Sequence, residues 1–406
     1  MNTLMPIPQN YKNTVDWILG AYADAGVSFP NGFQKDAIQN AVGARKTNKF
    51  KDWRCDISLV YNEFGTFVII EDTGTVGLTG KNTPAEEINA MMARNETLPS
   101  SERLSRFTSM FNSGGNNTGG GLYGAGKSVY AVASSEYTYY FDSLREDNIY
   151  IANINKCGQV MSKAYEGDEA KEYILKSTGL LPKTTVGTRV IIVSPKEELV
   201  DSITSGEIIP FIQESWWLTI TKMGDDSCIS VNGVPVCVPE GIKEGTHVFE
   251  LQSPEAYATS YKVKHFGLYV FGNGNNIWSG ISYYRKGMKI GDIDLKDVPS
   301  KIDGKFWGYI EVDEAWETEL AEIEDKVHFG VSKGKKIRST YQYLKNYCNE
   351  KFKANLIEWG YIKDKENEEM DWNPGDCCLS CYLGNSRISC KEFWNWWWKY
   401  SYGFGG

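Results

Sequence analysis

Residues 56–77 read DISLVYNEFGTFVIIEDTGTVG. Two apolar runs rich in β-branched residues, 56–61 and 66–72, flank the turn residues NEFG, a pattern typical of a β-hairpin. Upstream, residues 1–50 have apolar residues at helical spacing, and further strand-like runs follow a helix-prone stretch that begins at residue 126. Helices that come before and between antiparallel strands predict an α+β sandwich and not a doubly wound parallel sheet.

The hairpin ends in the sequence EDTGTVG (71–77), directly after the apolar run VII. A buried aspartate at a strand end, such as Asp72, can accept a hydrogen bond from the exocyclic amine of adenine, a donor that guanine lacks at this position. Gly74 and Gly77 let the backbone approach a base closely. The alternative interpretation is an ordinary Asp-Thr-Gly turn at the end of a strand.

Asp36 and Asn40 are four residues apart in a stretch with helical periodicity. Their carboxylate and carboxamide therefore share one face of a helix. An asparagine carbonyl suits Mg²⁺, which takes few protein ligands besides phosphate and water oxygens. A neighbouring carboxylate can deprotonate an attacking water. On its own, the same spacing usually indicates a solvated helix face.

Residues 121–128 read GLYGAGKS and open a helix-prone stretch. Backbone amides at a helix N-terminus bind phosphate, and Lys127 adds a positive charge. The string also satisfies the P-loop pattern GxxxxGK[ST]. A P-loop follows a buried strand, however, and the upstream residues FNSGGNNTGG (111–120) are too rich in glycine to form one. A phosphate-binding loop of another kind is preferred, with a P-loop NTPase as the alternative.

The order of these motifs resembles the GHKL superfamily of ATPases, which includes gyrase, heat-shock chaperones, histidine kinases and MutL. Acid-xxx-Asn precedes a hairpin ending in Asp-x-Gly, a glycine-rich lid and GxxGxGKS, and Gly187-Thr188-Arg189-Val190 then opens a strand. The resemblance covers residues 30–195 and rests on four ordered motifs. It implies a Bergerat-type ATP pocket between a sheet and helices, with a lid that closes over the triphosphate.

The resemblance also implies a role for each motif residue. Asp36 would be the general base and Asn40 the Mg²⁺ ligand, while Asp72 would contact adenine beside Thr188. The residues implied in nucleotide binding are Asn40, Asp72, Gly74, Gly77, Gly121, Gly124, Gly126, Lys127, Ser128 and Thr188. Most relatives that hydrolyse ATP carry glutamate where this chain has Asp36. A regulatory module that binds ATP with little turnover is therefore the alternative function.

Residues 226–350 are strand-rich and resemble the transducer domain that follows the pocket in gyrase, MutL and MORC relatives. The run 327–333 resembles the loop that sends a lysine to the γ-phosphate, which makes Lys333 a candidate catalytic residue. A solvated basic loop is the alternative. The predicted organisation is an ATP-binding domain over 1–225, a transducer-like domain over 226–350 and a Cys/Trp-rich segment over 351–406.

The C-terminal segment contains four cysteines close enough in sequence to ligate one zinc ion. They are Cys377, Cys378, Cys381 and Cys390. Two of the four are adjacent, which is awkward in a tetrahedral site, so buried free thiols are the alternative. The three histidines are isolated in the sequence, and neither a metal nor a catalytic role is assigned to them: His247, His265 and His328.

Composition restricts the class of protein further. The net charge of −9 argues against a chain that coats nucleic acid, although the basic run 333–338 leaves direct nucleic-acid binding open. The sequence has no apolar run long enough to cross a bilayer, and residues 1–20 lack the layout of a secretory signal. Nine cysteines, mostly scattered, fit reduced thiols, so we expect a cytoplasmic protein without a membrane partner.

These features together predict an ATP-binding and ATP-hydrolysing conformational switch that uses Mg²⁺. The resemblance implies that two protomers form a homodimer when ATP closes the lid and separate after hydrolysis. No large client-binding or nuclease segment is visible, so the output is expected in an unidentified partner protein. Compact bacterial ATPases of this kind resemble components of phage-defence and restriction systems, which is the setting we expect.

Overall fold

A computed structural model gives the fold of the chain. It describes residues 4, 11–47, 49–94, 96, 98–109, 127–251, 255–257, 261–271, 278–325, 328–331, 339–363, 381–383 and 386–388. The chain forms two compact units, residues 1–352 and residues 353–406. The first unit has two β-sheets with helices packed on them, so the fold is α+β with one large sheet and a second mixed sheet, as the sequence predicts.

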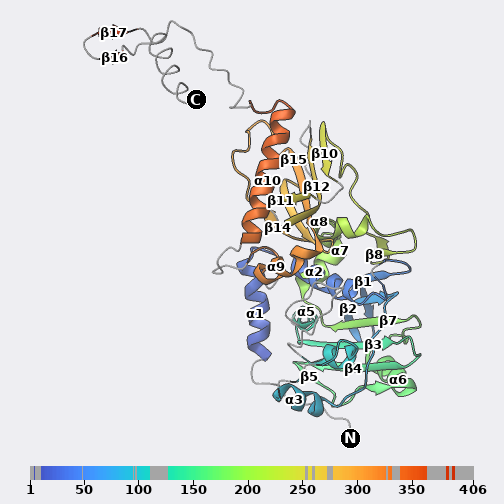
Figure 1. Cartoon of the computed structure of the whole chain (residues 1–406). Helices are drawn as coiled ribbons and strands as arrows, with labels where there is room; N and C mark the ends of the chain where they lie inside the picture. The colour runs from blue at the N-terminus through green and yellow to red at the C-terminus, as the bar shows by residue number, and fades with distance from the viewer. Residues whose placement is uncertain are drawn as a thin grey trace. The chain divides into compact units, whose positions relative to one another are not determined.

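The large sheet contains nine strands among the described residues. Eight of them follow the order β5-β4-β3-β7-β2-β1-β8-β9, of which β5 to β8 are labelled in Figure 1. The ninth strand, β6, pairs with β4. All pairs are antiparallel except β1 with β8, which is parallel. The strands are β1 (Arg54–Asn62), β2 (Gly65–Thr73), β3 (Thr138–Leu144), β4 (Tyr150–Lys156), β5 (Gln159–Val160), β6 (Tyr165–Glu166), β7 (Gly187–Val193), β8 (Cys228–Val231) and β9 (Val234–Pro235).

The predicted hairpin is present as β1 and β2, which pair from Arg54↔Thr73 to Asn62↔Gly65. The boundary predicted at residue 225, however, would separate β8 and β9 from the sheet in which they pair. Because β8 pairs with a strand far away in the sequence, with Cys228 opposite Arg54, no local sequence pattern reveals this partnership.

The two faces of the large sheet are covered by different helices. Phe67 and Ile69 of β2 pack with Ile174 of α6 (Gly167–Thr178) in one apolar cluster. The other face carries α5 (Ser128–Ala133), which contacts β3 and β7, and α7 (Glu197–Ser205), which contacts β1; α2 (Phe29–Gly43) packs on both helices. Side chains alternate along a strand, so Asp72 of β2 points to the same side as Val68 and Ile70, toward α2 and α5.

Helices α1 (Tyr11–Asp24) and α2 form the helical region predicted within residues 1–50. Val15, Ile18 and Tyr22 are buried at helical spacing along α1. Gly32 of α2 permits a close crossing, because a Cβ atom there would lie 2.4 Å from the Tyr22 ring. The crossing places the Tyr22 hydroxyl over the next turn of α2, where Asp36 lies.

The second sheet has the order β10-β12-β15-β13-β14, with β11 paired to β12. It is mixed, because β13 and β15 are parallel and the other pairs are antiparallel. Its strands are β10 (His247–Leu251), β11 (Glu255–Tyr257), β12 (Tyr261–Val270), β13 (Gly280–Arg285), β14 (Met288–Ile293) and β15 (Phe306–Val312). Helices α9 (Glu314–Ile323) and α10 (Ser339–Glu358) follow it in the chain.

Helix α8 (Ile208–Ile220) joins the two sheets. Trp216 donates from Nε1 to Gln34 Oε1 of α2 at 3.2 Å, whereas the adjacent Trp217 donates from Nε1 to Tyr284 OH of β13 at 2.8 Å. Trp217 also packs with Trp307 in a buried aromatic cluster of the second sheet. One helix therefore couples the position of α2 to that of the second sheet.

Candidate functional site

Asp72 lies at the end of β2, buried on the helix-covered side of the large sheet. Its Oδ1 accepts from the Thr75 hydroxyl at 2.5 Å and from the Thr188 backbone amide at 3.0 Å. The register of β2 with β7, in which Glu71 pairs with Arg189, is what brings Thr188 to Asp72. Burial raises the pKa of Asp72 to about 6, against the two hydrogen bonds, which lower it.

Backbone segments approach one another closely around Asp72. A Cβ atom at Gly187 would lie 2.1 Å from the carbonyl oxygen of Asp72. Gly77 has a φ of 70°, and a Cβ atom there would lie 2.8 Å from the carbonyl oxygen of Leu144. The Ser143 hydroxyl, which no sequence motif singles out, donates to Gly187 O at 2.8 Å and accepts from Leu78 N at 2.9 Å. The strand ends and the 74–78 turn thus form one connected rim.

Asp36 and Asn40 lie one turn apart on α2. Asp36 is buried, and its Oδ2 accepts from Tyr22 OH at 2.5 Å. Burial raises the pKa of Asp36 above its ordinary value, while the charge of His328 and the Tyr22 hydrogen bond lower it. Asn40 donates from Nδ2 to Tyr130 OH of α5 at 3.1 Å. The helix thus presents both predicted residues on the side that meets α1 and α5.

Lys127 precedes α5 and is held by the backbone of α4 (Arg103–Thr108) and the residue after it. Its ammonium donates to the carbonyl oxygens of Arg106 and Ser109. Loss of solvent, together with the nearby charge of Arg106, lowers the pKa of Lys127 to about 7. Ser128 is buried as the first residue of α5. The predicted phosphate-binding glycines Gly121, Gly124 and Gly126 fall outside the described residues.

Two arginines of α4 were missed by the sequence analysis. Burial lowers the pKa of Arg103 and of Arg106, and the charge of Arg106 lowers that of Arg103 further. Within the described part of the chain, neither forms an ion pair. The hydroxyls of Ser105 and Ser109 beside them are buried and have no hydrogen-bond partner among the described residues. Their spacing, three residues apart in front of the glycine-rich segment, is the signal that could have identified the arginines.

The predicted catalytic residue Lys333 lies outside the described residues, but the segment just before it is described. His328 Nε2 lies 4.0 Å from Asp36 Oδ1. Lys35 of α2 donates to the His328 carbonyl oxygen and lies 3.9 Å from the centre of the Phe329 ring. His328 is isolated in the sequence and was assigned no role there, but the structure brings it to Asp36.

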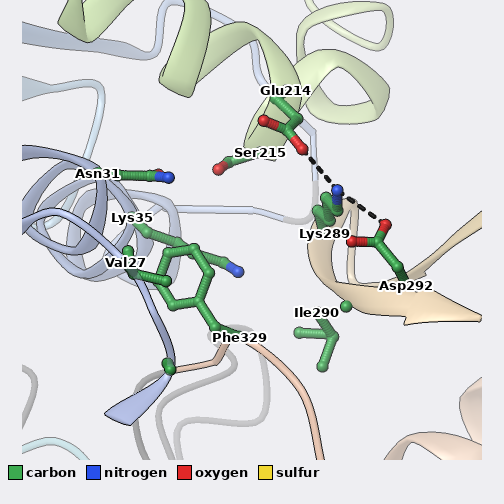
Figure 2. Close-up of a pocket in the computed structure, with 11 residues that line it drawn as sticks. Val27, Asn31, Lys35, Glu214, Ser215, Lys289, Ile290, Asp292 and Phe329 are labelled. Carbon is green, nitrogen blue, oxygen red and sulfur yellow. Dashed lines mark hydrogen bonds and ion pairs between the residues drawn. The ribbon is translucent and has the colours of Figure 1, made fainter. Parts of the chain in front are cut away.

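A cavity of about 190 Å³ lies on the Lys35 side of α2. Figure 2 shows Lys35 alongside the Phe329 ring, and Lys289 between Glu214 and Asp292 across the cavity. The amine of Lys289 is 2.5 Å from Glu214 and 2.9 Å from Asp292. The described residues that line the cavity do not include Asp36, Asn40, Asp72 or Lys127. The cavity is therefore next to the candidate site and separate from it.

The zinc prediction falls largely outside the described residues. Cys381 begins β16 (Cys381–Leu383), which pairs with β17 (Ser386–Ile388), and its side chain is not described. Cys377, Cys378 and Cys390 are not described at all. In the part of the chain that is described, no group of three or more His, Cys, Asp or Glu side chains could hold a metal ion.

Comparison with known proteins adds no assignment. No protein-family model matches the chain, and no curated protein is significantly similar to it. Among the described residues, no helix has both the length and the apolar character needed to cross a membrane.

Proposed function

We propose that the chain binds ATP with Mg²⁺ between the large sheet and helices α2 and α5, and that it hydrolyses the nucleotide. The observation that carries the proposal is the hydrogen bonding of Asp72. Within the described residues, both donors to this carboxylate, from Thr75 and Thr188, bond to Oδ1. Oδ2 is left as an acceptor, which suits the exocyclic amine of adenine. The glycine-lined rim allows a flat base to approach the backbone.

The two arginines Arg103 and Arg106, called here the α4 cations, and the neighbouring Lys127 support the proposed binding of the triphosphate. Burial is the main cause that lowers the pKa of Arg103 and of Lys127, and the charge of Arg106 repels both groups and lowers these pKa values further. A triphosphate would offset this repulsion and give the guanidinium groups charge-assisted hydrogen bonds. It would also replace the two backbone carbonyls that now hold Lys127. Nucleotide binding would therefore change how α4 is tied to α5, which is how we propose that a lid responds to ATP.

Asn40 and Asp36 of α2 support the proposed hydrolysis of ATP. The Asn40 amide nitrogen is committed to Tyr130, which leaves the carbonyl oxygen as the group that would hold Mg²⁺. When bound, the ion would neutralise phosphate charge. Asp36 would accept the proton of the attacking water while the bond to the leaving ADP oxygen breaks. The protein would form a homodimer in the ATP state, as GHKL ATPases with this motif order do. It would act on a partner protein in phage defence or restriction.

One observation favours binding with little turnover as the second candidate. The two carboxylate oxygens of Asp36 face Tyr22 and His328, and a base held in this way needs to reach water before it can act. The P-loop alternative is weaker, because α5 packs on β3 and β7, which are antiparallel to each other, whereas the βαβ units around a P-loop build parallel sheets.

Adenine selectivity tests the proposed pocket. We expect titration calorimetry with Mg²⁺ to show binding of ATP, and binding of GTP at least about tenfold weaker, because guanine would place a carbonyl oxygen against the Asp72 carboxylate. Thr75→Val, which removes one donor to Oδ1 but not the carboxylate, is the matched control and should keep the preference. Equal affinity for the two nucleotides, or no heat with ATP, would contradict the proposal.

The role of the α4 cations can be separated from that of the adenine pocket. We expect Arg106→Gln to weaken ATP binding about tenfold, the effect of losing one charge-assisted hydrogen bond, and to leave AMP binding within about twofold. Arg94→Gln removes an exposed arginine paired with Glu96 in the same stretch and should change neither. An equal loss for ATP and AMP would mean that Arg106 supports the fold and not the phosphates.

A further inference from the structure

Asp36 is the end of a buried chain of charges that leads to the second sheet. His328 Nε2 lies 4.0 Å from Asp36 Oδ1, and His328 Nδ1 is hydrogen-bonded to Glu324 Oε1. Glu324 Oε2 accepts from Arg285 Nε at 2.9 Å and from its terminal nitrogen at 2.6 Å. Arg285 is the last residue of β13. This row of charged side chains therefore connects α2 to β13, an interior strand of the second sheet.

Each link in this chain is held in place. Asp36, His328, Glu324 and Arg285 are all at least nine-tenths buried. Glu324 pairs with Val331 in an isolated bridge, which closes the turn that carries His328. Burial by itself would raise the pKa of Glu324, but the charges of His328 and Arg285 outweigh burial and lower it. A charged Glu324 carboxylate beside Nδ1 of His328 keeps that nitrogen protonated. Nε2, which faces Asp36, then carries the second proton whenever the His328 ring is charged.

The four side chains of this row alternate in charge: Asp36 and Glu324 are acidic, and His328 and Arg285 are basic. With His328 protonated, two carboxylates and two cations sum to zero, which is the condition under which buried charges are tolerated. The other groups that face Asp36 are Tyr22 from α1, Lys35 from α2 and Asp325 beside Glu324. Lys35 lowers the pKa of Asp36, and Asp325 raises it. Without the His328 charge, Asp36 would lose the strongest of the described influences that lower its pKa.

We propose that His328 is a positioning residue for Asp36: held by Glu324 and Arg285 of the second sheet, it keeps Asp36 in the charged form that a general base needs. The proposal rests on the proposed ATPase function. During hydrolysis the water proton would pass to Asp36 and leave with phosphate or solvent, and His328 would neither give nor take a proton. Seating of the 328–331 segment on α2 is then a condition for chemistry, so the second sheet controls turnover without touching the nucleotide.

The kinetic test is the pH dependence of ATP hydrolysis by His328→Gln in the full chain. We expect kcat at pH 7 to fall about tenfold and the acid limb of the kcat profile to move up by about one pH unit or more, as loss of a charge at 4 Å predicts. KM for ATP should stay within about twofold. The matched control is His265→Gln, which removes a histidine of β12 that lies beside Glu311 of β15. It should leave the pH profile of kcat unchanged. A lower kcat with an unmoved acid limb would overturn the proposal.

A second measurement needs no nucleotide. The chain has three histidines, so NMR titration of the imidazole rings can be assigned with single His→Gln variants. We expect Asp36→Asn to change the imidazole signals of His328, because a charge 4.0 Å from Nε2 is removed, and to leave the signals of His247 and His265 unchanged. An unmoved His328 in Asp36→Asn would overturn the proposal whether or not the protein hydrolyses ATP. A wild type without ATP binding would instead refute the proposed function, with the His328 coupling still decided by this titration.

Discussion

Replacement of Asp36 by asparagine is expected to reduce ATP turnover about a hundredfold or more, as loss of a general base does. ATP affinity should stay within about twofold, because binding rests on the Asp72 rim and the α4 cations. Asparagine retains the shape of the side chain and an oxygen that accepts from Tyr22 OH, so the variant should fold. Single-turnover and steady-state hydrolysis, with calorimetry for affinity, measure the two effects separately.

The matched control for this substitution is Asp16→Asn, an exposed aspartate on α1, which should leave both parameters unchanged. If Asp36→Asn hydrolyses ATP at the wild-type rate, another carboxylate is the base. If the wild type binds ATP but its turnover is already as slow as that of the variant, the chain is the binding module described above as the second candidate. Both results would leave the adenine pocket standing.

Asp72→Asn is expected to weaken ATP binding about a hundredfold, a few kcal/mol, because the amide group that replaces Oδ2 would present a donor to the donor on adenine. Calorimetric titration of the wild type and the variant measures this loss. The control is Asp147→Asn, an exposed aspartate paired with Arg145, for which we expect no change. Unchanged affinity in Asp72→Asn would place the adenine site elsewhere.

The same substitution should make the protein more stable at neutral pH. The pKa of Asp72 is about 6 in the fold, raised by burial from 3.8. Protonated Asp72 therefore favours the folded state fully below pH 3.8, and this contribution is lost as the pH rises through 6. The difference in free energy of unfolding between Asp72→Asn and wild type should grow over that range to about 1–3 kcal/mol at pH 8.

Denaturant unfolding of both proteins at pH 4.5 and pH 8 measures this difference. Asparagine Oδ1 can still accept from Thr75 and Thr188, which is why the variant should not lose those contacts. A variant less stable than the wild type at pH 8 would show that the carboxylate charge is better solvated than its burial indicates. Greater stability together with weaker ATP binding would mean that the site keeps a charged Asp72 at a cost in stability.

The sequence by itself determined the local parts of the structure. The four-residue spacing of Asp36 and Asn40 placed both on α2, and the turn residues NEFG joined β1 to β2 with Asp72 at the strand end. These predictions succeeded because helix periodicity, strand alternation and turn chemistry depend on neighbours a few residues away. The α+β class followed from the order of the same elements.

Only the tertiary structure decided which distant residues meet. Thr188 reaches Asp72 because β7 pairs with β2, and β8 joins the large sheet because it pairs with β1. His328 lies at Asp36, far away along the chain, because the turn after α9 is fixed by Glu324 and seated on α2 by Lys35. Such contacts depend on strand order, register and packing between sheets, and residue spacing encodes none of these: a lone histidine has the same local sequence whether it lies in solvent or beside a buried carboxylate.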